Sequence, residues 1–379
     1  MANSSRNSTL TIHGRSLPDS HRPPQGIKDR LANKAAQSIA ALFGIPKPGQ
    51  QIPFPALALF SPHVDSLRFG STHFGIMIPD LPAPHQFMSF ASILGMLGVK
   101  IVDVDHAVSS DGPRHTALLV HGTAQTPNDA FSSYGMKTDM DIKADGSLIR
   151  FGKDAELSGV YPNFKLKSQR DGFSTDINLT ATGDITWFGH SPFYQHFSLL
   201  IRYDGTFTHH GKSIPITGLC TWEYWQAVSL YLPVNKLIPR RFKLGADFFT
   251  YQVINLNQET QLLLAYVAFL DRPLAKFAYI RTVGGGSQQL DADVRFKVLT
   301  AQAEPAIAPD GFAMTLPQTF RWTITSRTGE SLFEINATVD TPMLYGLAAG
   351  YVGAYHWEGT RNGQPLTGRG YVEYIDQRD

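Results

Sequence analysis

The residue best suited to chemistry lies in a short aromatic stretch, residues 221–225, which reads TWEYW. Glu223 stands at its centre, between Trp222 and Tyr224 and two residues before Trp225. A carboxylic acid in apolar surroundings keeps its proton, because desolvation raises its pKa, and it can then protonate an alkene or a polyene. Aromatic faces would stabilise the developing carbocation. We therefore take Glu223 as a candidate catalytic acid and the three aromatic residues as candidate substrate-binding residues; the alternative is a surface glutamate at the end of a strand.

A second candidate stretch, ITWFGHSPFYQHF, covers residues 185–197. Tyr194 and His196 are two residues apart, so on an extended strand they share one face. A histidine there could position water, and a tyrosine could hydrogen-bond a carbonyl group of a ligand. We predict catalytic roles for these two residues and substrate contacts for Trp187 and His190. The other interpretation, that all four pack the mouth of a barrel, stays open.

A third stretch, residues 72–90, contains His73, Gln86 and Phe90 around a proline-rich loop. These three side chains are candidates to face a ligand cavity, although a structural role is the interpretation that we favour for them.

Several classes of protein are excluded by what the sequence lacks. It has one cysteine, Cys220, and no HExxH or HxExH motif, so we expect neither a disulfide nor a metal site. Its net charge is +1 and no basic run stands out, which excludes a nucleic-acid partner. We expect no cofactor, and a hydrophobic small molecule as the partner. The polar start and the absence of 18 consecutive apolar residues predict a cytoplasmic protein; contact with a membrane surface and the oligomeric state stay open.

The elements that must position these residues are mostly strands. Residues 27–44 have apolar residues at helical spacing and end in glycine, which predicts one amphipathic helix. From residue 68 onward apolar and polar residues alternate, as in DADVRFKVLTAQ at residues 291–302. Turn dipeptides such as Asp204-Gly205 follow about every ten residues and favour hairpins. The sequence therefore predicts an all-β antiparallel fold, a sandwich or barrels, with residues 1–26 as a disordered arm.

The phrase around Glu223 occurs twice. PITGLCTWEY at residues 215–224 matches PLTGRGYVEY at residues 365–374 in five of ten positions, and Glu373 is the equivalent of Glu223. Presence in both copies also favours a structural role for the glutamates. A long period repeated twice predicts tandem modules. We divide the chain into an arm with the helix (1–50), a first β module (51–230) and a second (231–379).

The closing segment GTRNGQPLTGRGYVEYID, together with residues 191–225, resembles the AttH and carotenoid 1,2-hydratase superfamily. Trp357-Glu358-Gly359, Gly368 and Gly370-Tyr371 match the glycine and aromatic motifs of its last strands. The departure lies at the acid, since this chain has Glu223 with Trp and Tyr as neighbours where the family has Asp beside His.

The resemblance implies two tandem lipocalin-like β-barrels with a pocket for a long apolar molecule. It also implies a cofactor-independent enzyme, a hydratase/lyase or a cyclase/isomerase, that acts on an isoprenoid-, polyketide- or steroid-like substrate. The alternative function is a carrier that binds a lipid or isoprenoid without turnover, in which the same aromatic residues only line the pocket.

Overall fold

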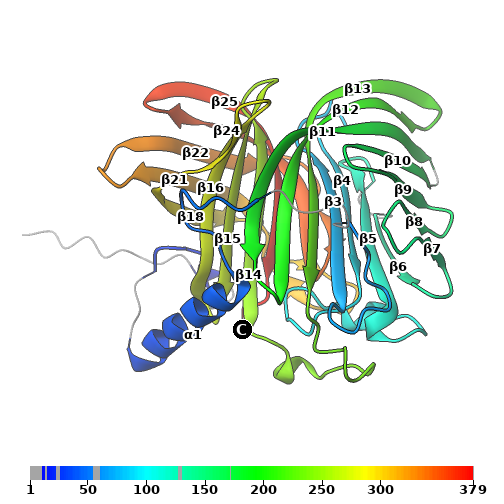
Figure 1. The fold of residues 1–379 in the computed structure, drawn as a ribbon. Helices are drawn as coiled ribbons and strands as arrows, with labels where there is room; N and C mark the ends of the chain where they lie inside the picture. Colours follow the sequence, from blue (N-terminus) through cyan, green and yellow to red (C-terminus); the bar gives the residue numbers. More distant parts are fainter. Residues whose placement is uncertain are drawn as a thin grey trace, which may run out of the picture.

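Two large curled antiparallel sheets form the body of the molecule in the computed structural model (Figure 1). The structure describes residues 11–12, 15–22, 26–53, 60–126, 130–170 and 172–378. The sheets are the near-barrel and half-barrel of a tandem lipocalin-like fold, and one α-helix precedes them. The prediction of an all-β antiparallel fold with a short N-terminal helix is confirmed.

The first sheet has eleven strands, and its two edges are β6 and β7. In spatial order its strands are β6 (Phe131–Gly135), β5 (Thr116–Thr123), β4 (Met88–Leu94), β3 (Ser71–Ile78), β13 (Lys212–Ala227), β12 (Tyr194–His209), β11 (Phe173–His190), β10 (Asn163–Arg170), β9 (Ala155–Val160), β8 (Leu148–Phe151) and β7 (Met140–Ile142). The strand that carries Glu223, β13, therefore lies between β3 and β12, near the middle of the sheet.

The second sheet has ten strands. In spatial order they are β17 (Gly286–Gln289), β16 (Arg272–Thr282), β15 (Thr260–Phe269), β14 (Ala246–Asn255), β25 (Gln364–Asp376), β24 (Gly350–Arg361), β22 (Ser331–Val339), β21 (Pro317–Ser326) and β18 (Ala292–Ala301), with β23 (Leu344–Leu347) paired to β24. The strand β25 lies between β14 and β24, which is the place that β13 has between β3 and β12.

The predicted helix is α1 (Ile27–Phe43), and Gly44 ends it in the left-handed conformation with a φ of 62°. It packs against β16 and β15 of the second sheet. Within the described residues no helix is both long and apolar enough to span a bilayer. The remaining short elements are the strand pairs β1 (Thr11–Ile12) with β2 (Arg15–Ser16) and β19 (Ala306–Ile307) with β20 (Ala313–Met314), and the 3-10 turns η1 (Asp105–Ala107), η2 (Pro113–His115) and η3 (Arg240–Phe242).

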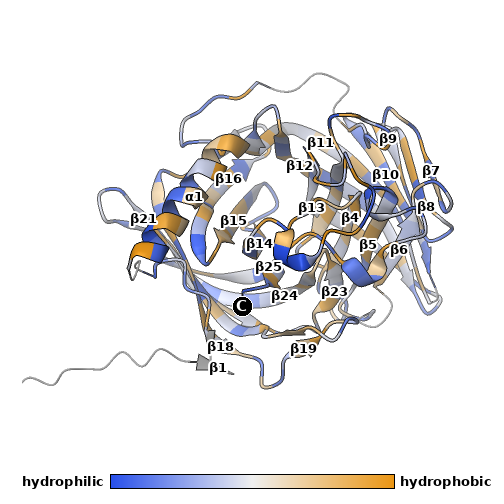
Figure 2. Cartoon of the chain, turned by 90° about the horizontal axis from the view of Figure 1, so that it is seen from below, coloured by the Kyte–Doolittle hydropathy of each residue, from blue (hydrophilic) through white to orange (hydrophobic). Residues whose placement is uncertain are grey.

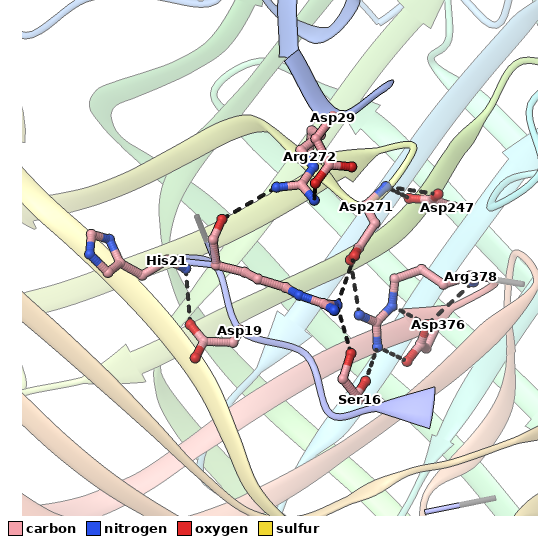
Figure 3. A network of polar contacts seen from close by, with 10 residues as sticks. Ser16, Asp19, His21, Asp29, Asp247, Asp271, Arg272, Asp376 and Arg378 are labelled. Atoms are coloured by element: carbon pink, nitrogen blue, oxygen red, sulfur yellow. Dashed lines mark hydrogen bonds and ion pairs between the residues drawn. The ribbon is translucent and has the colours of Figure 1, made fainter. Parts of the chain in front are cut away.

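Part of the expected disordered arm is ordered, which corrects that prediction for residues 15–22. The amide of Ser20 donates to the carbonyl of Phe296 at 2.9 Å, so the segment lies along β18. The guanidinium of Arg378 donates to the carbonyl of Ser16 within a wider network of aspartates and arginines (Figure 3). Polar groups of residues 15–22 therefore bind this segment to the second sheet. Residues 1–10 lie outside the described residues.

Apolar side chains form two main cores. One lies inside the curl of the first sheet and includes Phe90, Phe151 and Trp222. The other fills the second sheet and continues to the outer face of β3, β4 and β13, where Met77 and Trp225 belong to it. The two sheets therefore share one core where they meet, and the side chains on that face of β13 are buried although they point away from the first sheet's interior.

Candidate functional site

A cavity of about 360 Å³ lies where the two sheets meet. Its wall is mostly apolar and is drawn from β4, β13, β14, β15, β16 and the end of α1, with Leu42, Phe43 and Ile45 at the helix end. The size and the lining are typical of a pocket for an apolar small molecule. The ionisable side chains in this wall are His73, Tyr194, His196, Glu223, Tyr251 and Glu373.

The alternation of β13 decides which of its residues reach the cavity. Glu223 and Trp225 line it, whereas Trp222 and Tyr224 belong to the core inside the first sheet. Successive side chains of a strand point to opposite faces, so one face of the TWEYW stretch serves each core. Glu223 is only 4% exposed because the second sheet covers it. The sequence left the direction of Glu223 open, and the structure directs it into the cavity.

The three predicted catalytic residues are neighbours. The hydroxyl of Tyr194 lies 2.7 Å from Nδ1 of His196, and Nε2 of the same ring lies 3.5 Å from Oε2 of Glu223. Burial, and then the charge of Glu223, raises the pKa of Tyr194, so its hydroxyl keeps the proton and donates to Nδ1. With Nδ1 accepting from Tyr194, Nε2 is the ring atom that carries a hydrogen toward the carboxylate of Glu223.

Glu373 enters the same cavity from β25 of the second sheet. It is 3% exposed, and its Oε1 accepts a hydrogen bond of 3.0 Å from the hydroxyl of Tyr371. That hydroxyl lies 3.0 Å from Oγ of Ser89 on β4, so Glu373 is also tied to the first sheet. The repeated phrase thus places one glutamate from each sheet in one cavity.

The two carboxyl groups have opposite pKa shifts because their neighbours differ. Burial raises the pKa of Glu373 well above its ordinary value, and the charge of Glu223 raises it further, against the hydrogen bond from Tyr371. Burial also favours a raised pKa at Glu223, but the contact with His196, together with the proximity of His73 and the Tyr251 hydroxyl, outweighs it, so that its pKa is lowered.

This result differs from the expectation of a protonated Glu223. The expectation considered only desolvation, whereas the histidines that lower the pKa of Glu223 come from other strands. When the pKa values of two interacting carboxyl groups are shifted in opposite directions, the group with the raised pKa is the one that keeps its proton to higher pH. Here Glu373 is the neutral acid and Glu223 the carboxylate.

Three polar atoms of the site have no hydrogen-bond partner within the described part of the chain, namely Oε1 of Glu223, Nε2 of His196 and the hydroxyl of Tyr251. An unpaired buried polar group costs about 1–3 kcal/mol, so such groups are retained where a ligand or water satisfies them. His73 is also buried, and burial lowers its pKa to about 4, so it is neutral; its Nδ1 lies 2.9 Å from the carbonyl of Ser92.

Arg281 fixes the sheets to each other close to the site. It is fully buried on β16, and its guanidinium donates to Oγ of Ser198 at 2.8 Å and to Oγ1 of Thr221 at 3.0 Å, both on the first sheet. It also donates to Oε1 of Gln261 on β15. Because Thr221 is two residues before Glu223 on the same face of β13, this network holds the carboxylate in position.

The structure separates the predicted substrate-binding residues into two groups. His73 and Trp225 line the cavity, where their rings stack with centroids 6.0 Å apart. The others do not line it in the structure as described: Trp187, Trp222, Tyr224 and Phe90 pack inside the first sheet, His190 contacts Trp187 at the end of β11, and Gln86 lies in the loop before β4. A strand rich in aromatic residues has one face toward the interior of its own sheet and one face toward the cavity. Composition alone does not show which of these two faces an aromatic side chain lies on.

Three parts of the site were missed by sequence reasoning. Glu373 was considered only as a copy, although the repeat was itself the signal that could have placed it beside Glu223. Tyr251 lies on β14 next to Glu373 in the ladder, and α1 closes one side through Phe43; no local motif marks either. No group of three or more His, Cys, Asp or Glu residues suited to a metal occurs within the described ranges.

Two curled antiparallel sheets, a near-barrel and a half-barrel, define the class of tandem lipocalin-like folds. Within it, the chain belongs to a family of unknown function, DUF6670, whose model matches residues 91–379. A sequence search of curated proteins finds no match. The chain is similar in structure to kievitone hydratase from Nectria haematococca, with 14% identity over 89% of this chain and 97% of that one and a TM-score of 0.52. CghA in complex with Sch210972 matches over the same shares with 10% identity and a TM-score of 0.42. These similarities concern the fold.

Proposed function

We propose that the protein is a cofactor-independent enzyme that acts on a hydrophobic small molecule by acid–base catalysis in the cavity between the sheets. One observation carries the proposal: two buried glutamates, whose pKa values are shifted in opposite directions by their neighbours, face a mostly apolar cavity. A ligand-binding pocket without turnover has no need of them, and burying carboxyl groups costs several kcal/mol. Pairs of carboxyl groups with separated pKa values are typical of catalytic sites.

In this proposal each group has a role. Glu373 donates its proton to one carbon of a C=C bond, and the aromatic wall stabilises the cation that forms. In a hydration, water then adds to the cation and gives one proton to Glu223, so that the sum is the addition of one water. In an isomerisation or cyclisation, Glu223 takes a proton from carbon. Tyr194 orients His196, which orients Glu223. Hydration of an isoprenoid-, polyketide- or steroid-like substrate is the reaction we favour, in line with kievitone hydratase, which has the same fold.

The test is an incubation of the protein with an apolar extract of its own host in deuterium oxide, followed by mass spectrometry. Proton donation to carbon places deuterium on carbon, so an enzyme yields a labelled product. Glu223→Gln and Glu373→Gln should each abolish the label, with a loss of about a hundredfold or more for a missing acid or base. Glu358→Gln is the matched control, because Glu358 is exposed on the neighbouring strand β24.

The carrier alternative predicts a different result. Native mass spectrometry of the protein from its host would then show a bound apolar molecule that is released without label or change of mass. The two glutamine variants would bind it as the wild type does. That outcome would refute the proposed enzyme.

A further inference from the structure

Exposed apolar side chains gather around the mouth of the cavity. Five residues line the cavity and are still at least 40% exposed, and three more lie on the connection between β13 and β14, residues 228–245. We call these eight the mouth patch, and it consists of Leu42, Phe193, Val228, Leu230, Val234, Leu237, Phe242 and Leu244. They are eight of the fourteen exposed large apolar residues in the described part of the chain. Exposed large apolar residues that concentrate in one part of a surface mark an interaction site.

The charge of the same connection is of one sign. Residues 224–246 contain Lys236, Arg240, Arg241 and Lys243 and no aspartate or glutamate. Lys236, Arg240 and Arg241 are exposed, and the guanidinium of Arg241 lies 4.8 Å from the ring centre of Phe242. The connection therefore presents cations beside apolar side chains, which is the composition of segments that lie on an anionic lipid surface.

The helix adds a second segment of the same kind at this end of the molecule. Figure 1 shows α1 and the connection at the same lower end, and Figure 2, from below, shows hydrophobic and hydrophilic residues alternating along α1. Ile27 and Leu31 are 77% and 61% exposed, with Lys28, Arg30 and Lys34 beside them. The helix buries Ala36 against the sheet and leaves three of its larger apolar residues, Ile27, Leu31 and Leu42, exposed.

We propose that the mouth patch docks on an anionic membrane surface, so that an apolar ligand passes from the bilayer into the cavity without crossing water. Two observations favour a bilayer over a protein partner: exposed cations lie in the same connection as the apolar residues, and five residues of the patch also line a mostly apolar cavity. The proposal goes beyond the proposed enzyme, because it would serve a carrier equally, and its test requires no catalysis.

The experiment measures sedimentation of the full chain with vesicles of phosphatidylcholine, alone or with phosphatidylserine. We expect binding to the mixed vesicles that weakens as salt is added. The double variant Lys236→Glu/Arg241→Glu should weaken vesicle binding by roughly 25-fold or more. Each lost cation accounts for about fivefold, and the two new negative charges add to the effect. The control Lys143→Glu/Lys153→Glu changes exposed lysines on the far edge of the first sheet and should bind as the wild type does.

A second pair of variants tests the apolar part. Phe242 and Ile307 are 64% and 62% exposed, but only Phe242 belongs to the mouth patch. Phe242→Ser should weaken vesicle binding about tenfold or more, and Ile307→Ser should leave it unchanged. Thermal unfolding of each variant confirms that the fold is intact, since both positions lie on the surface.

Three outcomes would overturn the proposal. One is a wild-type protein that sediments with neither kind of vesicle. Another is binding that Phe242→Ser and Ile307→Ser reduce equally. The third is a wild-type dimer in analytical ultracentrifugation that Phe242→Ser converts to a monomer without any vesicle binding, which would assign the patch to a second copy of the chain.

Discussion

Replacing Glu373 by glutamine tests whether the Glu373 side chain is protonated in the folded protein. The amide has nearly the shape of the neutral acid, and its oxygen can accept the hydrogen bond that Tyr371 donates at 3.0 Å. The variant therefore keeps the packing of the wild type and loses only the titratable group. We expect it to be inactive and yet more stable than the wild type at neutral pH.

The magnitude follows from proton linkage. In the unfolded chain Glu373 loses its proton above its ordinary pKa of 4.5, whereas in the folded protein the pKa is raised well above that value. Between these two pKa values the folded state binds one more proton than the unfolded state, so raising the pH destabilises the wild type by about 1.4 kcal/mol per pH unit. Glu373→Gln has no such dependence. Its stability relative to the wild type should therefore increase by up to about 2 kcal/mol from about pH 5.5 to about pH 7.

Urea unfolding of both proteins across this pH range is the assay. Histidines and the other carboxyl groups titrate in both proteins and cancel in the difference, and the lowered pKa of Glu223 acts only below this range. Glu358→Gln on the exposed side of β24 should show no such trend. A difference between Glu373→Gln and the wild type that stays constant with pH would mean that Glu373 is already ionised in the folded protein. The assignment of Glu373 as proton donor would then be wrong.

Three other substitutions test the remaining parts of the site. Tyr194→Phe removes the hydroxyl that donates to the neighbouring imidazole and should lower kcat about fivefold to tenfold at unchanged KM for a substrate identified from the host extract, since the net value of one hydrogen bond is about 1 kcal/mol. Ala265→Phe places a ring in the cavity wall and should abolish the fluorescence of bound N-phenyl-naphthylamine, and unchanged fluorescence would move the ligand elsewhere. In Gly44→Ala the new Cβ would lie 2.1 Å from the carbonyl oxygen of His190, so urea unfolding should show a loss of about 2 kcal/mol or more, and more than Gly49→Ala, where φ is also positive but nothing lies within 4 Å.

Alternation predicted the strands because it reports burial directly. In β18, Val294, Phe296 and Val298 are buried and Arg295 and Lys297 are exposed, as the sequence indicates. The helix was predicted equally well, because the helical spacing of its apolar residues ends at a glycine.

The turn dipeptides were less reliable. Asp204-Gly205 lies inside β12, not in a turn, because Gly205 lets the backbone of β11 approach: a Cβ there would lie 2.3 Å from the carbonyl oxygen of Asp176. In the sequence, a glycine that close packing of two strands requires looks the same as a glycine that a turn requires. Only the partner strand distinguishes the two, and the local sequence does not contain it.

The position of the site was predictable in part for a similar reason. Tyr194, His196 and Glu223 lie on adjacent strands, and local reasoning selected them because each lies in an aromatic-rich stretch. The protonation states of these residues could not be predicted from the local sequence in the same way. The residues that decide it, His73 and Tyr251, come from β3 and β14, which join the site only when the two sheets pack together.

The presence of a glutamate in both copies of the repeated phrase was an argument for a structural role, and the structure supports a different conclusion. Gly218 packs on the ring of Tyr203 and Gly368 on the ring of Trp357, so the two phrases have equivalent surroundings up to this point. They differ around the carboxyl groups, where Glu223 meets two histidines and Glu373 meets a tyrosine. Under the predicted duplication, one ancestral acid would have become two groups in one cavity, and the difference in neighbours is what separates an acid from a base. Under the proposed function, repetition and catalysis are therefore compatible, because a repeat would supply the pair of glutamates and the packing of the sheets gives the two glutamates different neighbours.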